Sequence, residues 1–108
     1  MQLETTMVIA PQVYEVGDDG LDQDIHLWWD ESSDDGFDAD TGERDWKWGG
    51  NSTAELPASI STFQVLDEML DTLADKTLYP NLQSVVMAGH SAGGQLIQRY
   101  ALFSTRGK

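Results

Sequence analysis

One short stretch of the chain, Gly89-His90-Ser91-Ala92-Gly93-Gly94, holds a serine among the small residues that a nucleophilic serine needs. It matches the pattern Gly-x-Ser-x-Gly, in which the serine lies on a sharp turn between a strand and a helix. Glycines at 89 and 93 would leave room, because a β-carbon there would collide with neighbouring backbone. The turn would expose the Ser91 hydroxyl beside the Ala92 amide at the positive end of a helix. This predicts half of an acyl-transfer site, whereas the alternative is a glycine-rich turn with a hydrogen-bonded serine.

A serine hydroxyl also needs a base at neutral pH, and the chain has two histidines. His90 is the immediate neighbour of Ser91, so we expect its side chain to point away from the hydroxyl and into packing. His26 lies in an acidic stretch, where an aspartate could orient its imidazole as a catalytic triad requires. Nothing in the pattern directs His26 toward Ser91, so neither histidine is predicted to be the base.

The acidic residues gather in one part of the chain. Residues 15–45 hold 13 of the 19 Asp and Glu residues, and only Arg44 opposes them. The apolar residues there follow neither a helical nor a strand period, so we predict an acidic surface loop over residues 15–50, with a short element near 21–29. Six of its carboxylates could bind calcium: Asp34, Asp35, Asp38, Asp40, Glu43 and Asp45. Their spacing does not fit an EF-hand loop. A solvated loop is the expectation.

Four tryptophans are the other unusual feature of this region. Trp28, Trp29, Trp46 and Trp48 could line a pocket for an acyl or aromatic substrate. They could equally fasten a polar loop to the core, because a buried indole supplies a large apolar area. We expect the second role.

Two stretches carry apolar residues at helical spacing, and they predict helices over 60–75 and 92–104. Ser61 and Gln64 form a capping box at the start of the first. The periodic residues are Phe63, Leu66, Leu70 and Leu73 in the first, and Leu96, Ile97, Tyr100 and Phe103 in the second.

Two shorter apolar runs, residues 5–10 and 84–88, predict buried strands, and Pro11 ends the first of them. The order is strand, long loop, helix, strand, the turn at 89–94, helix. Strands joined through a helix should lie parallel with a right-handed crossover. We therefore predict the α/β class for a single domain over residues 1–108.

The composition excludes several functions. The chain has 108 residues, no cysteine and a formal net charge of −13. Such a charge repels nucleic acid and anionic membranes, and the lack of cysteine excludes a thiol nucleophile or a zinc–thiolate site. No run of apolar residues is long enough for a membrane span, and the first residues do not form a secretory signal. No cofactor is predicted, and the compartment is left unassigned.

Several further motifs accompany the turn: Val8-Ile9-Ala10-Pro11, Trp46-Lys47-Trp48-Gly49-Gly50-Asn51-Ser52, Phe63-Gln64-Val65-Leu66-Asp67, Tyr79-Pro80-Asn81-Leu82 and Arg99-Tyr100-Ala101. Together with residues 89–95 they resemble the α/β-hydrolase superfamily, and most of all its uncharacterised fungal hydrolase-like proteins. The resemblance covers residues 7–103 with gaps and leaves out the acidic loop. The motif around Ser91 is its specific portion.

The resemblance implies a serine hydrolase of esters, thioesters or amides that acts through an acyl-enzyme on Ser91. It makes the Ala92 amide an oxyanion donor and Gly89, Gly93 and Gly94 the packing positions of a nucleophile elbow at 89–94. The family's acid and histidine follow the serine, but residues 92–108 contain no Asp, Glu or His. A complete domain of this fold needs about 250 residues.

We therefore expect a central piece of such a domain that is inactive alone and self-associates through uncovered sheet edges. The alternatives are a non-catalytic remnant of the fold and an acidic calcium- or partner-binding module.

Overall fold

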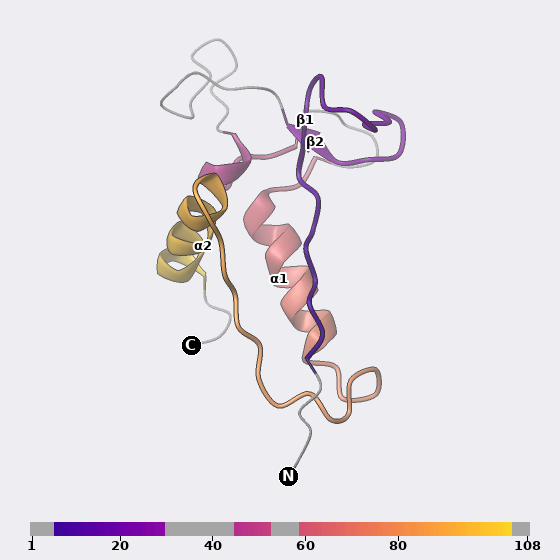
Figure 1. Cartoon of the computed structure of the whole chain (residues 1–108), viewed down its shortest axis with the longest axis vertical. Helices are drawn as coiled ribbons and strands as arrows, with labels where there is room; N and C mark the ends of the chain where they lie inside the picture. Colours follow the sequence, from indigo (N-terminus) through magenta and orange to yellow (C-terminus); the bar gives the residue numbers. More distant parts are fainter. Residues whose placement is uncertain (1–5, 30–44, 53–58, 105–108) are drawn as a thin grey trace.

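The computed structural model describes residues 6–29, 45–52 and 59–104 (Figure 1). Along the chain they form the strands β1 (Tyr14–Glu15) and β2 (Trp28–Trp29), the 3-10 helix η1 (Trp46–Trp48), and the helices α1 (Thr62–Leu73) and α2 (Ala92–Phe103). A parallel two-stranded sheet with two longer helices gives the chain mixed α/β character. No helix within the described ranges is long and apolar enough to cross a membrane.

Both long helices confirm the sequence prediction to within about two residues at each end. Helix α1 begins after Ser61, whose side chain accepts a hydrogen bond from the Gln64 amide at 3.0 Å. This is the serine half of the predicted capping box, and it satisfies an amide that the first turn leaves without a partner. Helix α2 begins directly after Ser91.

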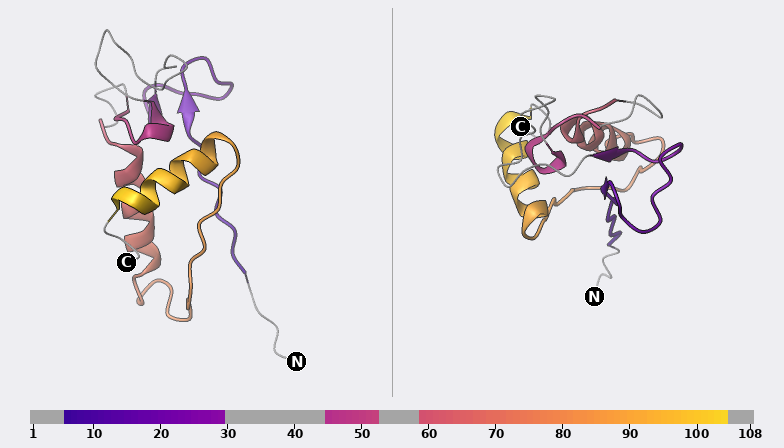
Figure 2. Two further views of the ribbon diagram at one scale, coloured as in Figure 1. Left: turned by 90° about the vertical axis from the view of Figure 1, so that its left-hand side faces the viewer. Right: turned by 90° about the horizontal axis from the view of Figure 1, so that it is seen from above.

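The two helices meet at a small core. Its buried residues are Leu66 of α1 and Leu96 and Tyr100 of α2. The Tyr100 ring contacts Phe63 edge to face, with centroids 5.7 Å apart, and its hydroxyl donates to Asp67 at 2.6 Å. Helix α2 thus crosses the first turns of α1 (Figure 2). The Tyr100 side chain contributes both apolar area to this core and a hydroxyl that is hydrogen-bonded.

The acidic region is more ordered than predicted. Strand β2 falls within the short element expected near 21–29, but β1 and η1 include residues where only a loop was predicted, so the loop over 15–50 is wrong there. Strands β1 and β2 pair in parallel, with Tyr14 beside Trp28 and Glu15 beside Trp29, and η1 follows at Trp46. Two-residue strands are too short to show a period of two, which is why neither β1 nor its pairing with β2 was predicted. Residues 30–44, with most of the acidic cluster, lie outside the described residues.

The prediction that residues 5–10 and 84–88 are strands of a sheet is also wrong. Residues 6–13 and 84–88, here named the extended segments, run in the same direction past α1 (Figure 1), as predicted for parallel strands. No ladder joins them to each other or to any described residue. Val8 is 85 % exposed and Val86 87 %. An apolar run shows that side chains prefer burial, but a strand also needs a neighbour for its backbone groups.

Candidate functional site

Ser91 has the strained backbone that the sequence predicts. Its φ is 55° and its ψ −121°, and it is the one non-glycine residue in the described ranges with positive φ. Such a conformation costs on the order of 1–3 kcal/mol and persists only where the surroundings fix it. Because α2 begins at the next residue, Ser91 lies at the sharp entry into a helix.

The glycines around Ser91 explain how the chain makes this turn. A β-carbon on Gly89 would lie 2.3 Å from the Gly93 carbonyl oxygen and 2.7 Å from the Gly94 nitrogen, so residue 89 must be glycine. Gly94 is in reciprocal contact, since its β-carbon would lie 3.3 Å from the Gly89 oxygen. Gly93 differs from the prediction, because a β-carbon there would meet no described atom within 4 Å. Only the backbone of Gly93 is needed, as the surface against which Gly89 packs.

The Ser91 hydroxyl is exposed and makes no capping hydrogen bond with α2. The Ala92 amide also donates to no described residue, whereas the amides of Gly93 and Gln95 bond the carbonyls of His90 and Ser91, each at 3.0 Å. An open hydroxyl therefore lies next to an open amide at the positive end of a twelve-residue helix. This arrangement can present a nucleophile and one hydrogen-bond donor to the same carbonyl group.

Neither histidine completes the site. The His26 ring stacks on Tyr14 with centroids 4.8 Å apart, and its Nδ1 accepts the Asp22 amide at 3.0 Å. His90 is exposed rather than packed, which corrects the expected burial of its side chain. Among the described residues, neither imidazole makes a hydrogen bond with Ser91.

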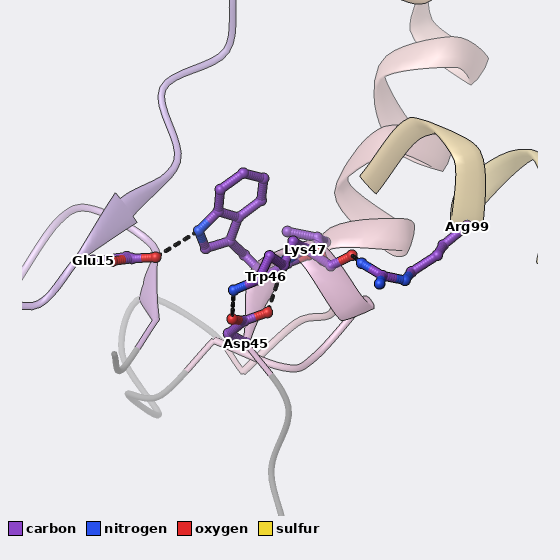
Figure 3. Close-up of polar contacts among 6 residues, drawn as sticks. Glu15, Asp45, Trp46, Lys47 and Arg99 are labelled. Atoms are coloured by element: carbon purple, nitrogen blue, oxygen red, sulfur yellow. Dashed lines mark hydrogen bonds and ion pairs between the residues drawn. The ribbon is translucent and has the colours of Figure 1, made fainter. Parts of the chain in front are cut away.

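A set of contacts between η1 and α2 fixes the helix that carries the site (Figure 3). The Arg99 guanidinium lies 3.5 Å from the centroid of the Trp48 ring and donates to the Lys47 carbonyl at 3.1 Å. Asp45 accepts from the Lys47 amide at 3.1 Å and pairs with its ammonium group. The sequence analysis did not predict that Arg99 joins α2 to η1. The sequence does contain a hint of this contact. Arg99 is the one charged residue between Asn81 and Phe103, and a chain rich in tryptophan offers rings on which a guanidinium can stack.

The tryptophans act as anchors, as expected. Trp29 is 3 % exposed and donates to the Gly50 carbonyl at 2.9 Å, and Trp46 donates to Glu15 at 2.8 Å and packs on the helical core. Trp28 has a buried indole nitrogen without a partner in the described part of the chain.

An apolar groove of about 390 Å³ lies elsewhere, and neither Ser91 nor any tryptophan lines it. Its walls come from α1 and from four other places in the chain, which contribute Ile9, Leu27, Ile60 and Tyr79. This groove is therefore not the tryptophan-lined substrate pocket that the sequence offered as an alternative.

The proposed calcium ligands fall mostly on residues 30–44, outside the described residues. Asp45 is described, and it is buried and engaged with Lys47. In the parts of the chain that the structure describes, no three His, Cys, Asp or Glu side chains gather as a metal site requires.

The chain was compared with protein-family models, with curated proteins and with solved structures, and none of the three comparisons found a match.

Proposed function

We propose that Ser91 is the nucleophile of a serine hydrolase site, with the α/β-hydrolase type of nucleophile elbow as its frame. The observation that carries the proposal is the positive φ of Ser91 at the start of α2, combined with a hydroxyl that no described residue engages. A serine that served only to cap the helix would bond an amide of the first turn, as Ser61 does in α1. The strain at Ser91 instead exposes the hydroxyl.

The reaction that this geometry suits is acyl transfer from an ester, thioester or amide. The Ser91 Oγ would attack the carbonyl carbon, the carbonyl π electrons would move onto oxygen, and the Ala92 N–H would stabilise the resulting oxyanion. Collapse of this intermediate expels the leaving group and gives an acyl-enzyme. Water then releases the acid.

The Ser91 proton must pass to a base during the attack, and the described residues place none beside it. Removal of a single triad member lowers kcat by several powers of ten in serine proteases. We therefore expect no ester turnover by the 108-residue chain alone.

A thiol in place of the hydroxyl tests the site without requiring a base. The chain has no cysteine, so Ser91→Cys and Gln98→Cys each carry one thiol. Gln98 is exposed on α2 two turns after Ser91 and is a matched control away from the helix start. The helix N-terminus should lower the pKa of the thiol at 91 by roughly half a unit or more relative to that at 98.

The measurement is the rate of alkylation by iodoacetamide against pH. A lower pKa and faster alkylation near neutral pH at position 91 would support the proposal. Equal pKa values and rates at the two positions would favour the non-catalytic remnant, because the amide and hydroxyl would then lack the electrostatic advantage that acyl transfer needs.

A further inference from the structure

The extended segment Ser84–Ala88 has the side-chain pattern of a strand but no backbone partner among the described residues. Met87 packs against the helical core, Val85 is 44 % exposed and Val86 is 87 % exposed, so alternate residues face opposite ways. None of its backbone amides or carbonyls bonds a described residue. Figure 1 shows it as a lone trace leading up to α2. A row of free N–H and C=O groups specifies its complement, which is another extended strand.

The distribution of charge along the chain indicates which molecule could supply that partner strand. Residues 81–98 contain no Asp, Glu, Lys or Arg, although the whole chain carries a net charge of −13. Two copies of the chain repel each other over most of their surfaces, whereas an uncharged stretch such as this one lets them approach at a lower electrostatic cost. Residues 84–88 of a second copy also form a strand of the required kind, since they are extended, uncharged and partly β-branched.

We propose that the chain forms a two-fold dimer in which Ser84–Ala88 pairs with the same residues of a second copy. A two-fold axis makes two identical edge strands antiparallel. The register that pairs all five residues sets Val86 opposite Val86, Val85 opposite Met87, and Ser84 opposite Ala88. Because the paired backbone is neutral and the rest of the surface repels, added salt should strengthen the dimer rather than weaken it.

Cysteine cross-linking tests this register, since the chain has no thiol of its own. Opposite residues in antiparallel strands have Cα atoms about 4.5–5.5 Å apart, within reach of a disulfide. Val86→Cys should therefore link to itself. Ser84→Cys alone should not, because its two copies would lie about 14 Å apart, but its mixture with Ala88→Cys should link.

Val8→Cys is the matched control, because Val8 is 85 % exposed in the other extended segment. Val86→Cys should cross-link at least about tenfold faster than Val8→Cys under mild oxidation. Equal rates would overturn the proposal and indicate unspecific contact. Cross-linking between Val8→Cys and Val86→Cys in a mixture, faster than either alone, would overturn it in favour of pairing between the two different segments.

Sedimentation equilibrium provides the second readout. The unmodified chain should be a dimer at high salt, Val86→Pro should be a monomer because proline cannot join the ladder, and Val8→Pro should remain a dimer. A monomeric unmodified chain at all concentrations and salt levels would contradict the proposal. Neither result depends on Ser91.

Discussion

The η1–α2 junction and the extended segments differ in how far their polar groups are bonded. At the junction, the Arg99 guanidinium lies over the Trp48 indole ring and donates to the Lys47 carbonyl, and the Asp45 carboxylate caps η1. In the extended segments the backbone ladder is missing and two valines are more than four-fifths exposed. The site helix is therefore fixed by contacts close to it, whereas no strand of the described residues pairs with the extended segments.

The largest expected effect of a substitution is at the core. Tyr100→Ala removes a ring that is 3 % exposed, together with its contacts to Phe63 and Asp67, and should destabilise the fold by about 3–5 kcal/mol. Val8→Ala, at a residue that is 85 % exposed, should change stability by no more than about 0.5 kcal/mol. Urea unfolding followed by circular dichroism measures both. Similar losses for the two would show that the extended segment is packed after all.

The next largest effect distinguishes Gly89 from Gly93 in the turn at 89–94. Gly89→Ala should cost about 1–3 kcal/mol, because its β-carbon would lie 2.3 Å from a carbonyl oxygen. Gly93→Ala, with open space and a helical position, should be neutral or stabilising by about 0.5–1 kcal/mol. The order of the two urea midpoints checks this, and a reversed order would mean that the turn is not packed through Gly89.

Arg99 should contribute less than Tyr100 to the free energy of unfolding. Arg99→Lys keeps the positive charge but loses the planar stack on Trp48, so it should cost about 0.5–2 kcal/mol and change tryptophan fluorescence. The matched control is Lys76→Arg, at an exposed residue in the turn after α1. If the two variants unfold alike and fluoresce alike, Arg99 does not fasten α2 to η1.

The smallest effect is a pH dependence at the exposed turn after α1. The Thr77 hydroxyl, followed by its amide, bonds Asp75 and lowers the pKa of that carboxyl below its ordinary value of 3.8. A lowered folded-state pKa stabilises the fold above the unfolded-state value, and this contribution disappears as the pH falls through the folded-state value. In an NMR titration, Thr77→Val should raise the pKa of Asp75. An unchanged value would show that the hydroxyl bond does not form in solution.

Local signals predicted the parts of the molecule that local chemistry decides. The Ser61 cap and the spacing of Phe63, Leu66 and Leu70 set α1, and the glycine-rich turn gave both the start of α2 and the positive φ of Ser91. The two strands failed because pairing depends on a distant neighbour that an apolar run does not specify. The pairing of β1 with β2 was missed because the tryptophans of β2 are held by single contacts, such as the bond from the Trp29 indole to the Gly50 carbonyl. Single contacts of this kind leave no periodic pattern in the sequence. The catalytic role of Ser91 stays a prediction.

The most direct test of the account is labelling of the purified chain by a fluorophosphonate probe, located by mass spectrometry, with and without imidazole as an external base. The account predicts no labelling without imidazole, and with imidazole a modification confined to Ser91 that disappears in Ser91→Ala. Labelling spread over exposed serines such as Ser84, with no preference for Ser91, would contradict the central claim that this turn presents a nucleophile. Stoichiometric labelling of Ser91 without imidazole would contradict the absence of a base, and His26 would then be the first residue to replace.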